Sequence, residues 1–280
     1  MGLRTLAARF VRQICPPLLL DPLLGLLDRA GIVRRRRIWE GVYAHVRDVP
    51  RRGAGWSGAA FREVSVARVR RILEAAPGRL GAVADENLTL LAAVAAVVRH
   101  SAGGRLRVLE FGGGPGISYA YLSRALDDAS GLEHHVVELE GVCEDGARLF
   151  GGDARVHFHR SWPEGLAGVD LVFSSSAIET VEDWQEVLRT LCAYRAEYVL
   201  LSHVCGGVFG TYASALQLVP ESVVPAWFLN LEEVVDVVTG CGYRLVARSP
   251  QERVHVQDNF PAVLRLPGGH PSVLLFARNS

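Results

Sequence analysis

The feature that most constrains this chain is a glycine-rich segment that directly follows an apolar run, within residues 107–118. An apolar run with an acidic residue at its end is typical of a buried parallel strand, and residues 117–126 after the glycines have helical spacing. Gly112, Gly114 and Gly116 allow positive φ angles and a close approach of the backbone to a ligand. The amide-rich start of the following helix favours a carboxylate or a phosphate. This segment predicts the first unit of a nucleotide-binding α/β sheet.

The spacing of the glycines decides between ligand classes. The dinucleotide pattern Gly-x-Gly-x-x-Gly fails, because Ile117 or Tyr119 stands where the third glycine is needed. The phosphate loop fails as well, since the chain contains no lysine. The pattern that fits is Glu-x-Gly-x-Gly-x-Gly, which resembles the first motif of the class I S-adenosylmethionine-dependent methyltransferases and comprises Glu110, Gly112, Gly114 and Gly116. A glycine-rich turn without a ligand is one alternative. A nicotinamide-dependent oxidoreductase is another, since it would share the fold, but its glycine fingerprint is absent from this sequence.

Length and composition set the broad class of the protein. A chain of 280 residues, 49% of them hydrophobic, suffices for one large domain or for a domain with an appendage. Thirty basic residues, all arginine, balance thirty acidic ones, so no global field favours a nucleic-acid partner. Five scattered cysteines without a C-x-x-C pair indicate reduced thiols and a cytoplasmic protein. Histidines 134, 135, 157 and 159 have no Asp, Glu or Cys at a usual ligand spacing, so we expect no metal.

The first part of the chain differs from the rest. Residues 1–37 combine helical apolar spacing with arginines, and no uninterrupted apolar run reaches the length of a membrane span. We expect an amphipathic helix that packs on its own protein or on a second subunit in a homodimer; a peripheral membrane contact is the alternative. Residues 1–82 are predicted to form an N-terminal helical extension, or lid. The methyltransferase domain is then expected at residues 83–280.

Strands and helices alternate after the glycine motif, which predicts a parallel sheet with right-handed crossovers. We expect an α/β, Rossmann-like sheet of seven mostly parallel strands with helices on both faces. One strand of the C-terminal pair, residues 243–247 and 272–277, is expected to be antiparallel. Seven strands in this order are what the methyltransferase resemblance implies.

Several further segments are similar to a narrower family, the bacterial methyltransferases associated with surface-polysaccharide and related biosynthetic gene clusters. The similarity spans residues 39–243 and depends on the order of its segments, which are Trp39–Tyr43, Phe111–Tyr119, His135–Glu138, the serines before Ile178-Glu179, and Pro225–Asn230 ahead of Gly242-Tyr243. Two positions depart from the family pattern. Glu179-Thr180 stands where a glutamine and an aromatic residue are expected, and Ser202-His203 where an acidic residue and arginine are expected.

The cofactor site is predicted around the glycine turn, with Gly113 part of it. Glu138 closes the second strand and would accept hydrogen bonds from the hydroxyls of a ribose; a solvated or helix-capping glutamate is the alternative, with Glu140 as a rival. Glu110 would meet the amino group of the cofactor or order the turn. Trp162 would stack on the adenine or close the edge of the core. The remaining predicted cofactor contacts are Tyr119, Ser174 and Ser175.

The resemblance implies methyl transfer from S-adenosylmethionine to a small-molecule or glycan acceptor in a biosynthetic pathway. A hydroxyl acceptor benefits from a general base, and His203 is preferred over Glu179 because its intrinsic pKa is nearer neutrality. Four residues would line the acceptor pocket or, alternatively, hold the lid onto the sheet: Tyr43, Ser176, Trp227 and Asn230. A non-catalytic binding protein on the same fold is the competing hypothesis.

Overall fold

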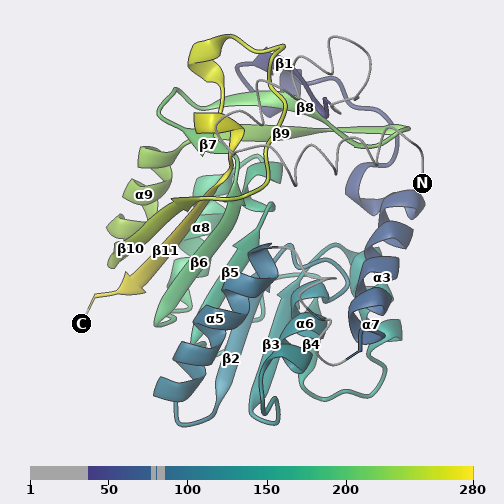
Figure 1. Ribbon diagram of the computed structural model, residues 1–280, viewed down its shortest axis with the longest axis vertical. Helices are drawn as coiled ribbons and strands as arrows, with labels where there is room; N and C mark the ends of the chain where they lie inside the picture. The colour runs from purple at the N-terminus through teal and green to yellow at the C-terminus, as the bar shows by residue number, and fades with distance from the viewer. Residues whose placement is uncertain (1–36, 77–79, 81–85, 280) are drawn as a thin grey trace, which may run out of the picture.

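The computed structural model describes residues 37–76, 80 and 86–279, and a seven-stranded sheet forms its centre (Figure 1). The strand order is β10-β11-β6-β5-β2-β3-β4. The five strands from β6 to β4 are parallel, whereas β11 is antiparallel to both β6 and β10. The prediction of a seven-stranded, mostly parallel sheet is confirmed. The strands are β2 (Leu106–Phe111), β3 (Leu132–Val137), β4 (Val156–His159), β5 (Leu171–Ser175), β6 (Tyr198–Val204), β10 (Tyr243–Pro250) and β11 (Ser272–Arg278).

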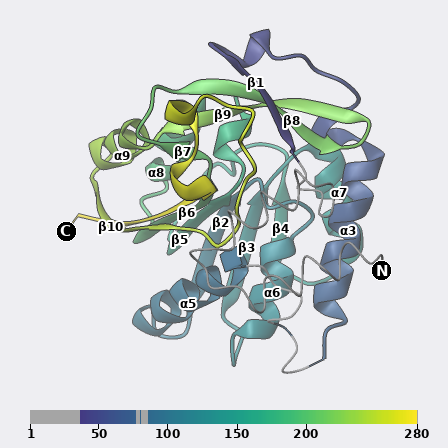
Figure 2. The ribbon, with the colours of Figure 1, turned by 45° about the horizontal axis from the view of Figure 1, so that its top comes forward.

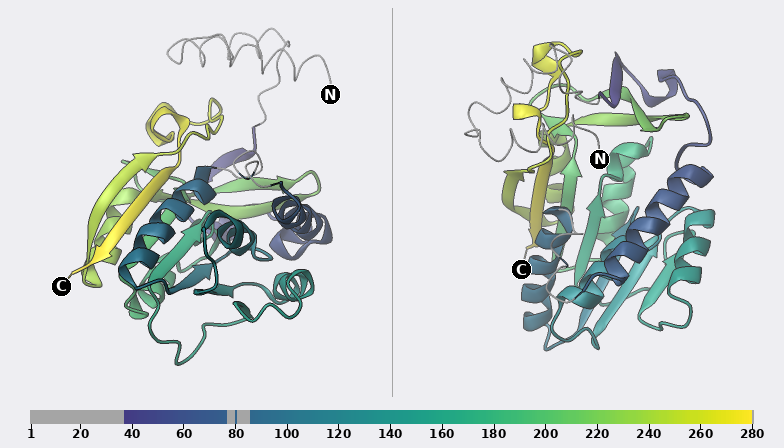
Figure 3. Two further views of the ribbon diagram at one scale, coloured as in Figure 1. Left: turned by 60° about the horizontal axis from the view of Figure 1, so that its bottom comes forward. Right: turned by 45° about the vertical axis from the view of Figure 1, so that its right-hand side comes forward.

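Helices cover both faces of this sheet, because the central strands are apolar on both sides. Leu106 and Val108 of β2 pack towards the face of α5 and α6, while Leu109 packs into the opposite core beneath α8 and α9. Figure 3 shows the sheet between these helices. The helices are α3 (Ala59–Leu73), α5 (Glu86–Ser101), α6 (Ile117–Ala125), α7 (Glu140–Leu149), α8 (Trp184–Ala193) and α9 (Leu231–Gly240).

A second, four-stranded sheet lies across the carboxyl ends of the parallel strands (Figures 1 and 2). Its order is β1-β8-β9-β7, with β1 and β9 both antiparallel to β8. The predicted helical lid falls on residues 1–82, of which residues 1–36 lie outside the described residues; within residues 37–76, β1 joins this sheet and a 15-residue segment is helical. The cover over the strand ends is built mainly from strands. Its strands are β1 (Trp39–Tyr43), β7 (Gly206–Gly207), β8 (Tyr212–Val219) and β9 (Ser222–Asn230).

The described part of the N-terminal region belongs to the same body as the rest of the chain. Strand β1 joins the second sheet, and α3 packs against α6 in a small core that contains Val69 and Ile72. The predicted amphipathic helix and its partner, a subunit or a membrane, fall on residues 1–36 and lie outside the described residues. No helix within residues 37–76 and 86–279 is long and apolar enough to cross a membrane.

Candidate functional site

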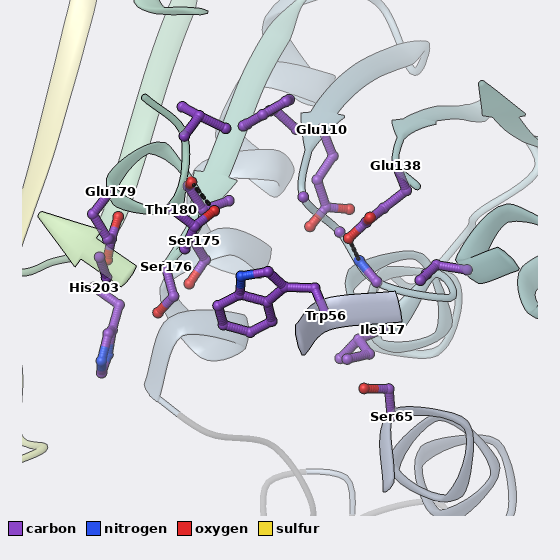
Figure 4. Close-up of a pocket in the computed structure, with 18 of the residues that line it drawn as sticks. Trp56, Ser65, Glu110, Ile117, Glu138, Ser175, Ser176, Glu179, Thr180 and His203 are labelled. Carbon is purple, nitrogen blue, oxygen red and sulfur yellow. Dashed lines mark hydrogen bonds between the residues drawn. The ribbon is translucent and has the colours of Figure 1, made fainter. Parts of the chain in front are cut away.

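A cavity of about 770 Å³ lies where the carboxyl ends of the parallel strands meet the second sheet (Figure 4). Ligand sites of α/β sheets occur at this edge. The glycine turn lines one part of the cavity, and β5, β6 and the segment around residue 255 line another. The predicted residues that line it are Glu110, Gly112, Gly113, Gly114, Glu138, Trp162, Ser175, Ser176, Glu179 and His203.

The glycine turn has the backbone that only glycine adopts without strain. Gly112 and Gly114 have φ angles of 72° and 60°. A Cβ atom added to Gly112 would lie 2.2 Å from the Cβ of Ala177, so this residue also allows the turn to approach the loop after β5. At Gly114 an added Cβ would meet only Ile117, at 3.4 Å. An added Cβ at Gly114 would thus make only ordinary van der Waals contact, and Gly114 borders the cavity.

Glu110 orders this turn from below. Its side chain is buried, and Oε2 accepts hydrogen bonds from the Ser118 hydroxyl and, at 2.9 Å, pairs with His134 Nε2. A Cβ on Gly113 would lie 2.4 Å from the Glu110 carboxylate, so the carboxylate fills the space beneath the turn. The ordering role is therefore supported by contacts within the protein. Glu110 also borders the cavity, so this role is compatible with a ligand contact.

Glu138 lies beside the glycine turn, as a ribose acceptor would require. Its Oε1 accepts from the Gly114 N–H at 3.1 Å, and its Oε2 accepts from the Leu139 N–H at 2.7 Å. Each oxygen retains a lone pair for a ligand hydroxyl. Burial raises the pKa of this carboxyl group, and the two backbone donors oppose that shift. The rival Glu140 side chain is 65% exposed and pairs with Arg160, which removes it from consideration.

The position of Trp162 is compatible with both of its predicted roles. One face of the indole stacks on Phe111, with ring centroids 5.3 Å apart and an interplanar angle of 21°. The same side chain lines the cavity and is only partly buried. The tryptophan therefore closes the core at the end of β2 and also presents apolar surface to a ligand.

Glu179 is the most unusual titratable group at the cavity. The side chain is 3% exposed, and burial raises the pKa of its carboxyl group from 4.5 to about 8. The backbone N–H groups of Cys205 and of Glu179 itself donate to the carboxylate, whereas Oε2 has no hydrogen-bond partner among the described residues. A buried carboxyl group with one free oxygen and a pKa near neutrality has the properties of a general base.

His203, the preferred base, belongs to a hydrogen-bonded row of three side chains. The Trp39 indole N–H donates to His255 Nδ1 at 3.2 Å, and His255 Nε2 lies 3.1 Å from His203 Nε2. An indole nitrogen can only donate, so His255 carries its proton on Nε2 and donates it to His203 Nε2. Burial lowers the pKa of His255 to about 3, which keeps this ring neutral.

Strained backbone marks the same region of the cavity. Ser176 and His203 have φ angles of 54° and 55°, which are uncommon for residues with a side chain. Both follow or end a parallel strand and line the cavity. Such outliers persist where the surrounding structure fixes them, and they gather at functional sites.

Two predicted cofactor contacts lie away from the cavity, and those predictions are wrong. The Tyr119 ring is buried between α6 and the sheet, against His134 and Phe150, and its hydroxyl donates to Asp153. Burial raises the pKa of Tyr119. The Ser174 hydroxyl is 2% exposed and donates to the Phe111 carbonyl at 3.1 Å.

Gly116 is a packing residue rather than a lining one. Its φ is 89°, and an added Cβ would lie 2.7 Å from the Phe150 ring. The expected cofactor contact at this glycine is corrected to a structural role. It ends the turn and lets α6 begin close to the Phe150 ring.

Three of the four predicted acceptor residues hold the cover in place instead of lining the cavity. The Trp227 indole N–H donates to the Val181 carbonyl at 3.0 Å. The Asn230 side chain caps α9 by accepting from the Glu232 N–H at 3.0 Å. Tyr43 packs against the core at the end of β1. These contacts are compatible with the alternative of holding the lid, and only Ser176 of the four borders the cavity.

Several lining residues carried no sequence signal that singled them out. Trp56 projects into the cavity in Figure 4, and Phe61 and Arg68 of α3 also line it. His255 lies in an irregular segment with no periodicity and no motif. It lies 52 residues from His203 along the chain, and this spacing does not predict that the fold brings the two rings together.

No protein-family model and no curated protein matches this chain. Solved structures that resemble it include the 1,6-didemethyltoxoflavin-N1-methyltransferase of Burkholderia thailandensis, which was crystallised with S-adenosylhomocysteine. The identity is 17%, over 80% of this chain and 92% of that one, with a TM-score of 0.49. Another is the magnesium protoporphyrin IX methyltransferase of Synechocystis PCC 6803, with 14% identity over 78% and 96% of the two chains and a TM-score of 0.49. A third is an amino pentose methyltransferase from Micromonospora echinaspora, with 14% identity, coverage of 69% and 92%, and a TM-score of 0.45. Likenesses this distant leave the function to be argued from the residues of the chain itself.

Proposed function

We propose that this chain is an S-adenosylmethionine-dependent methyltransferase that acts on a hydroxyl of a small-molecule or glycan acceptor in a biosynthetic pathway. The observation that carries the proposal is one cavity that has residues suited to the cofactor at one end and a residue suited to act as a general base at the other. At the first end Glu138 and the glycine turn are hydrogen-bonded to each other, and at the second Glu179 presents a free buried oxygen. Residues up to 82 would form the extension that covers the acceptor, since Trp56 and Phe61 line the cavity.

The residues at the glycine end fit the cofactor. Gly114 borders the cavity without a side chain, Glu138 can accept from both ribose hydroxyls, and Trp162 supplies a flat apolar surface for an adenine. The volume of about 770 Å³ lies within the range of ligand pockets, roughly 300–1,000 Å³. When bound, the cofactor supplies an activated methyl group on a sulfonium.

The protein then has to align the acceptor and remove its proton. Alignment of the reacting atoms alone can account for about 7–11 kcal/mol of the barrier. The acceptor hydroxyl would lose its proton as its oxygen takes the methyl group that the cofactor supplies. Glu179 Oε2 takes the hydroxyl proton. We assign this role to Glu179, because His203 Nε2 already accepts the proton of His255.

The cofactor assignment is tested by calorimetry with S-adenosylhomocysteine on the full chain. Glu138→Gln keeps the shape of the side chain but removes its charge. A hydrogen bond to a charged group is worth about 1.5–3 kcal/mol, so we expect a roughly ten- to hundredfold weaker affinity. Glu140→Gln is the matched control, because Glu140 is exposed and lies two residues away. Absence of binding to the folded wild-type chain would overturn the proposal.

A further inference from the structure

A second cluster of titratable side chains lies on β3 and β4, outside the cavity. Glu133 and His135 alternate on β3, and His157 and His159 alternate on β4, so all four share one face of the sheet. The strand register pairs His135 with His157. Residues 160–170, which connect β4 to β5 and are all described, contain no helix. This end of the sheet face is consequently only partly covered, and Glu133, His157 and His159 retain some exposure.

The contacts within this cluster are close and directional. His135 Nε2 lies 2.9 Å from Glu133 Oε1, and His135 Nδ1 lies 2.9 Å from His159 Nε2. The His157 ring stacks on His135, with centroids 4.6 Å apart. One ligand atom from each of Glu133, His135 and His157 lies within 4.8 Å of the other two. A carboxylate oxygen and two imidazole nitrogens therefore lie close to one another.

We propose that Glu133, His135 and His157 form a binding site for Zn²⁺ or a similar divalent transition-metal ion. Two histidines and one glutamate, with water in the fourth position, are a common ligand set for zinc. The expectation of no metal depended on the lack of a carboxylate near the histidines. Glu133 supplies it, because residues two apart on a strand point to the same side.

The hydrogen bonds around the cluster suit this role. A metal on His135 Nε2 requires the proton on Nδ1, and His159 Nε2 is placed to accept it. Such a second hydrogen bond orients most metal-binding histidines. Arg107, the cation beside the cluster, binds Glu133 through Oε2 at 2.7 and 2.9 Å and leaves Oε1 facing His135. The Glu133 carboxylate thus offsets the positive charge of Arg107, which would otherwise repel a metal ion.

Binding an ion requires the three side chains to move, and the His157 ring to turn out of its stacking on His135. With zinc–ligand distances of about 2.1 Å, ligand atoms in a tetrahedral site lie about 3.4 Å apart. The Glu133–His135 pair at 2.9 Å has to open slightly, and the His157 nitrogen, within 4.8 Å, has to approach by side-chain rotation. Partial exposure of Glu133 and His157 gives the ion and its water an entry path.

A competing cluster lies in the cavity, where ligand atoms of His203, Cys205 and His255 also fall within 4.8 Å of one another. There the Trp39 indole N–H donates to His255 Nδ1, which places the His255 proton on the nitrogen that faces His203. That nitrogen cannot bind a metal while it carries the proton. On β3 and β4 the Glu133 carboxylate adds a negative charge for the ion, and a shift of the His135 proton from Nε2 to Nδ1, towards His159, frees Nε2 to bind it.

The test is calorimetry of the full, untagged chain with Zn²⁺ alone, in the absence of cofactor and acceptor. We expect one ion per chain, with affinity weakened at least tenfold by Glu133→Gln and by His157→Ala. His159→Ala should weaken it by roughly 10–100-fold through the lost second hydrogen bond. His100→Ala, at an exposed histidine at the end of α5, is the control and should bind like wild type.

Three results would overturn the inference. These are no zinc binding by the folded chain, binding that persists in both Glu133→Gln and His157→Ala, and binding lost through Cys205→Ser. Circular dichroism of each variant separates loss of the site from loss of the fold. Since the measurement uses neither cofactor nor acceptor, its outcome is independent of the methyltransferase proposal.

Discussion

Replacement of Glu179 by glutamine should make the stability of the protein less dependent on pH. Burial raises the pKa of this carboxyl group in the folded state, from 4.5 to about 8. A group with a raised folded-state pKa favours folding while it is protonated in both states. That contribution is present below the unfolded pKa and is lost as the pH rises through the folded pKa. Glutamine stays neutral throughout, so the free energy of unfolding of the variant should rise relative to that of the wild type between about pH 4.5 and 8.

The size of the effect follows from the same two pKa values. One pKa unit corresponds to about 1.36 kcal/mol, so ionisation of Glu179 reduces the free energy of unfolding by about 5 kcal/mol well above pH 8. At pH 7 only part of this loss is reached, about 3 kcal/mol. Between about pH 5.5 and 7.5 the difference between variant and wild type should grow by about 2.5 kcal/mol. Any fixed cost of burying the glutamine amide adds equally at every pH.

Urea unfolding of both proteins at several pH values measures this difference directly. Glu182→Gln is the control, because Glu182 is exposed and lies three residues further on. A difference between Glu179→Gln and wild type that stays constant from about pH 5.5 to 7.5 would show that the buried carboxyl group has an ordinary pKa in the fold. The activity provides a second readout. If Glu179 is the base, the variant should lose about 10²–10⁴-fold in kcat/KM, with unchanged affinity for S-adenosylhomocysteine.

Two further predictions concern the frame around the cavity. Gly112→Ala should lower the free energy of unfolding by at least about 2 kcal/mol, since it adds a left-handed alanine and a Cβ 2.2 Å from Ala177. Urea unfolding should show a smaller loss for Gly152→Ala, where φ is 92° and the space is empty, and equal losses would contradict the argument. Trp39→Phe should cost about 1–3 kcal/mol, because it leaves His255 Nδ1 buried without its donor. If the row of rings positions only the acceptor end, cofactor affinity measured by calorimetry should not change.

The parts of the fold that sequence predicted well are those with a local signal. The central strands are short apolar runs, and Glu110 to Gly116 joins strand to helix in a pattern with few other uses. The order of strands and helices then leaves few topologies, because crossovers of parallel strands are right-handed. The closeness of Glu138 to the glycine turn was predictable for the same reason. Glu138 and the glycines lie at strand ends, where the fold itself places ligands.

The second sheet and the acceptor end depend on contacts between distant parts of the chain. Strand β1 pairs with β8, so that Trp39 lies opposite Leu216, far along the sequence. No periodicity in either segment indicates its partner. Tyr119 was wrongly assigned because helical spacing does not say which face of α6 is buried. Trp227 was wrong because an aromatic residue on a covering strand serves equally well to anchor that strand.

The row from Trp39 to His203 shows why the acceptor end needs the whole fold. Trp39 comes from β1, His255 from the segment between β10 and β11, and His203 from the end of β6. Each hydrogen bond fixes the proton of the next ring, so the state of His203 depends on whether the second sheet is in place. The cover therefore sets the chemistry of the acceptor end as well as its shape. If Glu179 is the base, as we propose, the hydrogen bond that His203 Nε2 accepts within this row explains why His203 is not, and the Glu179 residue lines the same cavity.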